Sequence, residues 1–184
     1  MDAAEVAVTL RRMAQEIVAQ HRPSSLDSLA LIGIYTRGVE VARRLGDLIA
    51  EAGGLRPASG VLDISMHRDD LRRRARLTSI QPTHLPVDLE DRTVILVDDV
   101  FFTGRTVRAA LDALGEYGRA PRIQLAALVD RGHRELPIRP DFTGKTVLTE
   151  FRDRVQVHFA PADGESDGVW LTRYPSGFGA TDER

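Results

Sequence analysis

The sequence predicts an α/β fold, in which a central and mostly parallel sheet is flanked by helices. Two short apolar runs, Leu29–Tyr35 and Thr93–Val97, have the unbroken hydrophobicity of strands that are buried on both faces. Segments with helical periodicity alternate with such runs, which is typical of parallel βαβ units. The 184 residues, 42% of them hydrophobic and 28% charged, fit one domain over residues 1–184.

The first half of the chain is predicted to alternate between helix and strand. Apolar side chains at helical spacing predict an N-terminal helix with a buried stripe of Val6, Leu10, Met13 and Ile17. After the strand Leu29–Tyr35, the segment Val39–Ala52 predicts a helix that ends at Gly53-Gly54, since glycine commonly closes helices. Ser59–Met66 then predicts a second strand.

The second half repeats this alternation with weaker signals near its end. A helix is predicted to open near Gly104 and to stop at Gly118. The predicted strands are Thr93–Val97, Ile123–Val129, Thr146–Leu148 and Val155–Phe159, the last two with weaker patterns. Ligands of parallel sheets bind beyond the carboxyl ends of the strands, so we expect the chemistry in the segments that follow these runs.

Two segments are predicted to lie outside the sheet and its helices. Residues 67–86 carry many charges and two prolines, so we expect an exposed loop or flap there. From Asp163 onward, glycine, acidic residues and Pro175 predict a loosely ordered tail over residues 163–184.

Composition narrows the function classes. The chain has no cysteine, which excludes disulfides, thiolate metal sites and cysteine nucleophiles. Its formal net charge is −2, so it lacks the positive excess that indiscriminate coating of nucleic acid requires, but a local basic patch is compatible with this value. No apolar run approaches the roughly 20 residues of a membrane span, and the N-terminus lacks a signal-peptide pattern. We therefore expect a cytoplasmic protein with no membrane partner.

The segment Val94–Thr106 indicates chemistry most clearly. Its strand leads into two adjacent acids, Asp98 and Asp99, and then into Thr103-Gly-Arg-Thr106 at the start of a helix. The first turn of a helix offers free N–H groups and a positive dipole end, and the threonine hydroxyls add donors, so a phosphate is favoured there. The acids would repel a phosphate, but they suit ribose hydroxyls or a Mg²⁺ ion shared with a pyrophosphate. Together these groups indicate a ribose 5-phosphate.

Simpler interpretations of the same residues carry less weight. A lone Asp-Asp is commonly a solvated pair and a lone Thr-Gly-x-Thr is commonly a helix cap, but here both follow a buried strand directly. The two common alternative phosphate motifs, the P-loop and the glycine-rich dinucleotide fingerprint, do not occur in the sequence.

The segment from Asp98 to Thr106 resembles the phosphoribosyl pyrophosphate (PRPP) signature of type I phosphoribosyltransferases. The resemblance implies a fold with a small hood and a flexible flap. It also implies that Asp98 and Asp99 hold the ribose, that Thr103–Thr106 hold the 5-phosphate, and that Mg²⁺ binds with PRPP and with these two acids. The implied PRPP contacts are Thr36, Arg37, Val94, Asp98, Asp99, Val100, Phe101, Phe102, Thr103, Gly104, Arg105 and Thr106.

Two further segments are similar to parts of that family. Thr36-Arg37-Gly38 resembles the pyrophosphate loop, whose backbone N–H groups and arginine would meet the leaving group. Residues 67–86 resemble the flap, with Arg68 as a pyrophosphate contact. The implied catalytic residues are therefore Arg37 and Arg68, which would neutralise charge on the leaving group, and Asp99, a candidate general base.

The segment Val129–Arg139, followed by Gly144-Lys145, is similar to the PyrR family, and Ile64–Leu71 fits the same family. Members are bacterial proteins that regulate pyrimidine genes by binding their transcripts and also act as uracil phosphoribosyltransferases. The implied partners are uracil, PRPP, UMP or UTP and the leader mRNA of a pyrimidine operon. The resemblance also implies a homodimer or a larger homo-oligomer.

The same resemblance implies which residues meet the base and the RNA. The base contacts are Arg131, Gly132 and Val157, and the RNA contacts are Arg11, Arg12, His133, Arg134, Arg139 and Lys145. Gln15 departs from the family pattern, which has a histidine on the first helix, and this weakens the RNA assignment. Isolated surface arginines are in most proteins solvated or in ion pairs.

Two alternatives stay open at the level of sequence. A phosphoribosyltransferase for a purine or another base would share Asp98–Thr106. A regulator that binds a nucleotide as effector and RNA as target, with little turnover, is the second alternative. Arg37 and the flap favour a working enzyme, because a sensor of UMP has no need of a pyrophosphate site.

Overall fold

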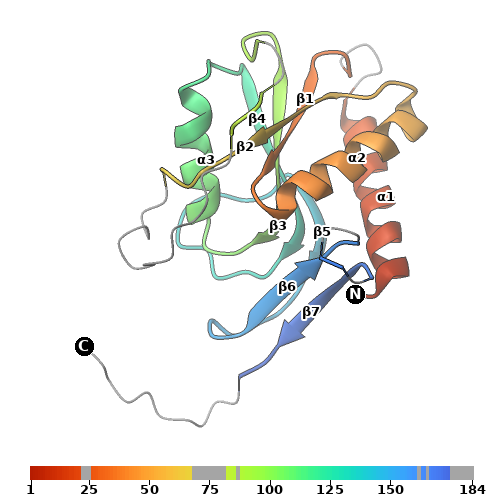
Figure 1. Cartoon of the computed structure of the whole chain (residues 1–184), viewed down its shortest axis with the longest axis vertical. Coiled ribbons are helices and arrows are strands. Elements are labelled where there is room, and N and C mark those ends of the chain that lie inside the picture. Colours follow the sequence, from red (N-terminus) through yellow and green to blue (C-terminus); the bar gives the residue numbers. More distant parts are fainter. Residues whose placement is uncertain (22–25, 68–81, 86–87, 161–162, 165, 175–184) are drawn as a thin grey trace.

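A five-stranded parallel sheet forms the centre of the computed structural model, which describes residues 1–21, 26–67, 82–85, 88–160, 163–164 and 166–174 (Figure 1). The strand order is β2-β1-β3-β4-β5, and each neighbouring pair is parallel. The strands are β1 (Leu29–Ile34), β2 (Ala58–Leu62), β3 (Thr93–Phe101), β4 (Arg122–Asp130) and β5 (Phe142–Thr146). This arrangement confirms the predicted α/β class.

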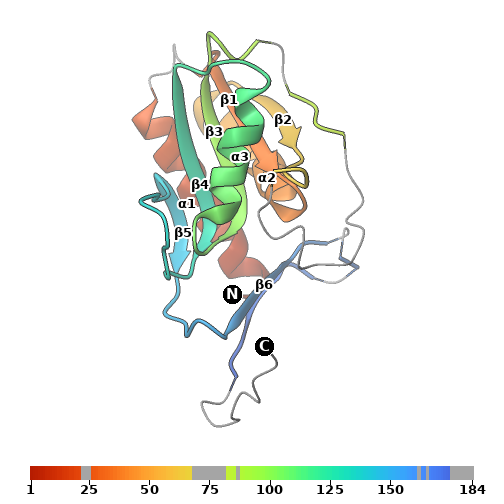
Figure 2. The same ribbon diagram turned by 90° about the vertical axis from the view of Figure 1, so that its left-hand side faces the viewer.

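Helices cover both faces of the sheet (Figure 2). Two of them, α1 (Ala3–Gln20) and α2 (Arg37–Gly53), pack on one face, and α3 (Arg105–Gly115) packs on the other. The predicted stripe of α1 is confirmed, since Val6, Leu10, Met13 and Ile17 are all buried. A capping box begins this helix. The Asp2 side chain accepts a hydrogen bond from the Glu5 N–H at 2.8 Å, and the Glu5 side chain accepts one from the Asp2 N–H at 3.0 Å.

The core consists of two apolar layers, one on each face of the sheet. Side chains alternate along β3, so Ile95 and Val97 pack toward α1 and α2, while Val94 and Leu96 pack toward α3. Each fully buried side chain of this kind contributes about 1.5–3 kcal/mol through removal of apolar surface from water. The two layers hold the strands rigidly, and with them the segments that follow their carboxyl ends.

A separate two-stranded ribbon, here called the hood, lies beyond the carboxyl ends of the central strands (Figure 1). It pairs β6 (Arg154–His158) with β7 (Gly168–Thr172) in antiparallel fashion. Backbone bonds of 2.8 Å in both directions join Met1 to Val169, so the N-terminus supports the hood. Val157 and Phe159 anchor it in the core layer under α1 and α2.

The hood corrects one prediction, because β7 falls within the segment expected to be a loose tail. Gly168–Thr172 contains the apolar pair Val169 and Leu171 at strand spacing. The acidic and glycine-rich residues around this short pattern concealed it. Residues 175–184 of the predicted tail lie outside the described residues.

Three strands differ from the predictions by more than one residue at an end. The strand expected over Ser59–Met66 ends at Leu62, because the Asp63 carboxylate accepts from the N–H and hydroxyl of Ser65 and forms a turn. The strand expected to end at Val97 continues to Phe101 through pairing with β4. These bonds place both acids inside β3 rather than after it.

The strand expected over Thr146–Leu148 lies earlier, at Phe142–Thr146. It is an edge strand in which only Phe142 is buried. Its residues therefore do not form the apolar run by which a buried strand is recognised in a sequence. Leu148 is 89% exposed and belongs to the segment that follows the strand.

Only the ends of the predicted flap are described. Residues 68–81 and 86–87, with the predicted pyrophosphate contact Arg68, lie outside the described residues. At the described end, His84 pairs with Val61 of β2, and the Thr83 hydroxyl accepts from the Asp63 N–H at 3.1 Å. Within the described part of the chain, no helix has the length and apolar character needed to cross a bilayer.

Candidate functional site

The carboxyl ends of β1 and β3 bring two predicted segments together. These strands are direct neighbours, and α2 begins immediately after β1. A Cβ at Gly38 would lie 2.4 Å from the carbonyl oxygen of Val97 and 3.2 Å from the Cα of Asp98. Only glycine therefore allows the first turn of α2 to touch β3 at the acids. This contact sets Thr36–Gly38 beside Asp98, and the peptide bond that precedes Thr36 is cis.

The two acids are held at the end of β3 in different environments. Asp98 is 6% exposed, and its Oδ1 accepts a hydrogen bond of 3.0 Å from the N–H of Asp99. Burial raises the pKa of Asp99, while the Asp98 hydrogen bond and the positive charge of Arg37 oppose this shift. Arg37 of the Thr36–Gly38 segment is therefore near enough to Asp99 to act on its charge.

The start of α3 has the features predicted for a phosphate site. Gly104 is the N-cap, with φ of 92°, a left-handed conformation that glycine adopts without a steric penalty. It has no side chain with which to satisfy the N–H groups of the first turn. The Thr103 Oγ1 accepts only a long bond of 3.4 Å from the N–H of Arg105. The helix therefore directs donors and its positive dipole end toward the edge of the sheet where the acids lie.

The segment that follows β4 supports this helix start. The N–H groups of Glu135 and Leu136 donate to the carbonyl oxygen of Thr103 at 3.0 and 3.3 Å. Glu135 also forms an ion pair of 2.7 Å with Arg105. Sequence reasoning missed this role of the Val129–Arg139 segment, because contacts between distant loops leave no local pattern.

A cavity of about 600 Å³ lies between the segments that follow β3 and β4 and the hood. Arg131 is 7% exposed, and its guanidinium carbon stacks 4.0 Å from the ring centre of Phe102. Burial lowers the pKa of Arg131. The cavity is lined by Phe102, Arg131, Phe151, Arg152, Asp153, Arg154 and Tyr174.

The predicted base contacts and PRPP contacts do not all reach this edge. Arg131 lines the cavity and Gly132 follows it directly. Val157, 1% exposed, has its side chain in the core, so only its backbone is available to a ligand. The Val94 side chain is fully buried in the layer under α3, four residues before Asp98, so its contact with PRPP stays a prediction. Phe101, 1% exposed, likewise offers only its backbone.

Arg37 is held by a residue that the sequence did not suggest. Its Nη2 donates to Asp163 Oδ1 at 2.9 Å, and its Nε donates to Oδ2 at 3.4 Å. The Arg37 side chain is still 40% exposed. Asp163 belongs to the segment predicted as a loose tail, and only the folded hood brings it to the start of α2.

The predicted RNA contacts fall into two groups. The first lies around α1, with Arg12 and Lys145 on the side of β5 and Arg11 on the side of α2, and every member of it has a partner. Arg11 pairs with Glu51 at 3.3 Å, and Lys145 pairs with Glu5 at 3.7 Å. Arg12 donates to backbone carbonyl groups of β5.

The second group lies on the segment after β4. The His133 ring bonds to the Thr149 carbonyl oxygen at 2.8 Å, and Arg134 pairs with Asp130. Arg139 is exposed.

Comparison with known proteins identifies the class to which this fold and site belong. A family model described as the phosphoribosyl transferase domain matches residues 2–159. A solved structure of the hypoxanthine phosphoribosyltransferase of Trypanosoma cruzi superposes with a TM-score of 0.68 over 94% of each chain. Its sequence is only 15% identical, so this likeness bears on the fold alone. Together, the family match and the fold define a phosphoribosyltransferase.

Curated relatives narrow the class further. A protein of Chloroflexus aurantiacus is 49% identical over 171 residues, which cover 93% of both chains. One of Deinococcus radiodurans is 50% identical over 160 residues, covering 87% of this chain and 86% of the relative. One of Thermus thermophilus is 49% identical over 90% of both chains. All three are called bifunctional protein PyrR. This chain belongs to the PyrR family of phosphoribosyltransferases.

Proposed function

We propose that the protein transfers the phosphoribosyl group of PRPP to uracil, which gives UMP and pyrophosphate. The observation that carries this proposal is the meeting of three groups at the carboxyl edge of the sheet. They are the Thr36–Gly38 segment, the Asp98–Asp99 pair and the glycine-capped start of α3. The arrangement supplies a cation for pyrophosphate, carboxylates for ribose hydroxyls, and N–H donors for the 5-phosphate. These are the three parts of PRPP.

The reaction breaks the bond between C1 of the ribose and a pyrophosphate oxygen and forms a bond from C1 to N1 of uracil. Positive charge develops on the ribose as the leaving group gains negative charge, so fixed charges stabilise the transition state. Arg37 is proposed to neutralise the leaving group. The N1 proton of uracil must leave, and the raised pKa of Asp99 makes this carboxylate a better proton acceptor than an ordinary exposed one.

Magnesium is proposed to bind together with PRPP. Among the described residues, no group of three or more His, Cys, Asp or Glu side chains is placed to hold a metal ion. The donors at this edge are the two carboxylates Asp98 and Asp99, which fit an ion that takes its other oxygens from the pyrophosphate and from water. When bound, Mg²⁺ would reduce the negative charge of the leaving group. Removal of magnesium with a chelator is expected to abolish turnover.

The base is proposed to bind beside the segment after β4. Arg131, Gly132 and the backbone of Val157 are the proposed contacts. Two aromatic rings line the cavity at the same place: Phe102, over which the buried Arg131 stacks, and the exposed Phe151. Planar bases stack favourably on such rings, by about 1–3 kcal/mol each.

An activity screen tests the transferase proposal. Purified protein is assayed with PRPP, Mg²⁺ and each of uracil, hypoxanthine, guanine, adenine and orotate. We expect product from uracil, and loss of most turnover in Arg37→Ala. Arg56→Ala, an exposed arginine before the amino end of β2, is the matched control and should retain activity. Turnover of a purine and not of uracil would refute the base assignment.

The basic groups support a second proposal, that the protein regulates pyrimidine biosynthesis genes by binding their leader mRNA under control of UMP or UTP. Arg12 and Lys145 lie where α1 meets β5, and Arg11 lies on the side of α1 that faces α2, where it pairs with Glu51. The ion pairs of Arg11 and Lys145 are exposed and therefore each worth only about 0–1 kcal/mol, so phosphate groups can displace the acids. We propose that this binding takes place in the cytoplasm, with the protein as a homo-oligomer.

A gel-shift experiment tests RNA binding. The organism's own pyrimidine leader RNA should bind more tightly than an unrelated hairpin, and more tightly with UMP or UTP than without. The logarithm of affinity should fall with that of salt, by about 0.7 per phosphate contacted if the RNA is single-stranded. Arg11→Ala and Lys145→Ala should each weaken binding and reduce this slope. Equal binding of both RNAs would contradict the proposal.

A further inference from the structure

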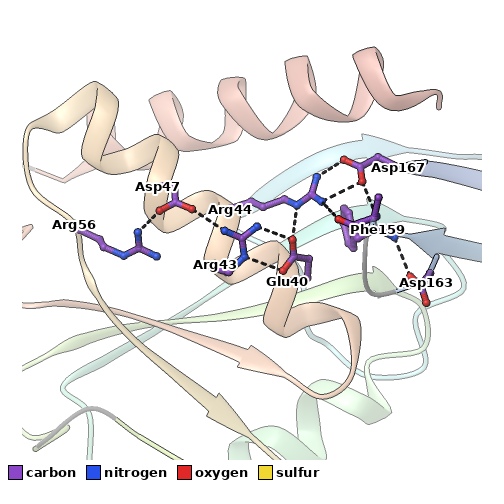
Figure 3. A network of polar contacts seen from close by, with 9 residues as sticks. Glu40, Arg43, Arg44, Asp47, Arg56, Phe159, Asp163 and Asp167 are labelled. Atoms are coloured by element: carbon purple, nitrogen blue, oxygen red, sulfur yellow. Dashed lines mark hydrogen bonds and ion pairs between the residues drawn. The ribbon is translucent and has the colours of Figure 1, made fainter. Parts of the chain in front are cut away.

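The loop that follows β6 is fastened to α2 by two arginines of one helix face. Arg37 binds Asp163. Arg44, seven residues further along the helix, binds Asp167 (Figure 3). Residues seven apart lie two turns apart on the same side of a helix. Arg44 also donates to the carbonyl oxygen of Ala160 at 3.1 Å and stacks 4.6 Å from the ring centre of Phe159. Both ion pairs join an arginine of α2 to an aspartate of the loop, but only the pair of Arg37 and Asp163 lies at the carboxyl edge of the sheet.

Asp163 is held in place by a backbone group of its own loop as well as by Arg37. Its Oδ2 accepts a hydrogen bond of 2.9 Å from the N–H of Phe159. This backbone bond is the largest cause of a lowered pKa at Asp163, and the bond from Arg37 adds to it. Phe159 itself is 1% exposed and fixed in the core. The Asp163 carboxylate is therefore a charged acceptor whose position is fixed by the backbone, and it lies beside the long side chain of Arg37.

We propose that Asp163 is a positioning residue of the transferase, which holds the Arg37 guanidinium in the orientation that receives the pyrophosphate of PRPP. This inference rests on the proposed function, in which Arg37 meets the leaving group.

The geometry of the guanidinium supports this role. Asp163 takes the Nε–H and one N–H of Nη2, which leaves the donors of Nη1 and the remaining donor of Nη2 for another acceptor. The side chain is 40% exposed, so a ligand can reach these donors. An unrestrained arginine loses rotamer freedom when it binds a ligand, and a preset partner reduces this entropic cost. The opposite role, in which Asp163 competes with pyrophosphate for Arg37, predicts the opposite change in PRPP affinity.

The test compares two matched variants, Asp163→Asn and Asp167→Asn. Both remove one carboxylate charge from the same loop and weaken one ion pair with α2. We expect Asp163→Asn to raise KM for PRPP about tenfold or more, since misplacement of a group at a reacting centre costs up to roughly 10²-fold. KM for uracil should change little. Asp167→Asn should lower the melting temperature and leave both KM values unchanged.

A double-mutant cycle tells whether Asp163 acts by orienting Arg37 or only by attaching the loop to α2. Because Arg37→Ala is expected to lose most turnover, the cycle measures PRPP affinity by calorimetric titration. In an Arg37→Ala background, Asp163→Asn should weaken PRPP binding no further, because the residue that it positions is gone. If Asp163→Asn does not fold, Asp163→Glu keeps the charge but displaces it, and KM for PRPP should rise to a smaller extent. Additive effects of the two substitutions would overturn the proposal. So would an unchanged or lowered KM in a folded Asp163 variant.

Failure of this inference can be told apart from failure of the proposed function. If the wild-type protein makes UMP and Arg37→Ala does not, while Asp163→Asn behaves like Asp167→Asn, only the positioning role is wrong. If the wild-type protein transfers to no base and binds no PRPP in a calorimetric titration, the proposed function itself is wrong.

Discussion

The carboxyl edge of the sheet and the hood face each other across the proposed site, but they are built by different means. At the edge, each functional group lies within a buried strand or at a helix start: Asp98 and Asp99 in β3, Arg37 in the first turn of α2, and Thr103–Thr106 at the start of α3. The hood has two short strands and is attached through Met1, Phe159 and the arginines of α2. Core packing positions the edge, whereas a few long-range contacts position the hood.

This difference suggests a division of work. The edge must hold charged groups in fixed geometry, and rigid strand ends do this well. Attachments through few contacts open more easily than a packed core. We therefore expect substitutions at the edge, and of Asp163 that contacts it, to affect the reaction most, and substitutions in the other attachments of the hood to affect stability first.

The largest effect is expected at Asp99. Asp99→Asn should reduce turnover by about 10²-fold or more, as is typical when a general base is lost. Asp112→Asn, an exposed acid on α3, is the control and should keep wild-type activity. A folded Asp99→Asn protein with near-normal turnover would remove this residue from the mechanism.

The same substitution should act on stability in the opposite direction. Burial raises the pKa of Asp99 in the folded protein above the value of about 3.9 in the unfolded chain. Ionisation therefore disfavours the folded state progressively as pH rises through the two values, and the full cost is present above the folded pKa. Asp99→Asn should melt at a higher temperature than the wild type at neutral pH. This gain should vanish by about pH 3, a unit below the unfolded value, where both states of the wild type are mostly protonated.

The next effect concerns the glycine that joins α2 to β3. Gly38→Ala places a Cβ 2.4 Å from a backbone oxygen and should cost about 1–3 kcal/mol of unfolding free energy, together with part of the activity. Gly115→Ala in α3 meets no atom within 4 Å and should be neutral or slightly stabilising. Equal stability of the two variants in denaturant titrations would show that α2 does not need this close approach.

The fastening of the hood should show a smaller effect. Asp167→Asn should reduce unfolding free energy by about 1 kcal/mol, because a partly buried charged hydrogen bond is lost. Asp47→Asn, in a more exposed network with Arg43 and Arg56, should change it by less (Figure 3). Arg44 lowers the pKa of Asp167, so this contribution is present above the unfolded pKa and is lost as pH falls through the folded pKa. The two proteins should therefore converge in stability in acid, as thermal melts across pH will show.

The contrast between edge and hood also explains what the sequence could predict. Buried strands such as Leu29–Ile34 and the stripe of α1 are local patterns with many apolar residues, so they were predicted with small boundary errors. The acids and the Thr-Gly-Arg-Thr run lie next to such a strand, and their proximity to Arg37 follows from parallel pairing. Neither β5 nor β7 has a comparable apolar run, so the former was misplaced and the latter was missed.

Contacts between distant segments escaped prediction for a different reason. The ion pair of Arg37 with Asp163 joins residues 126 positions apart, and its acid lies in a stretch with the composition of a loop. The support that Glu135 gives to Thr103 likewise depends on how two loops meet. Charge and spacing show which groups are available, but only the folded chain shows which of them meet.

The most direct test of the whole account is a crystal structure of the protein with PRPP and Mg²⁺. We predict the ribose hydroxyls at Asp98 and Asp99, the 5-phosphate at the N–H groups of Thr103–Thr106, and the pyrophosphate at Arg37. Electron density for PRPP at another place, or no density at saturating ligand, would contradict it.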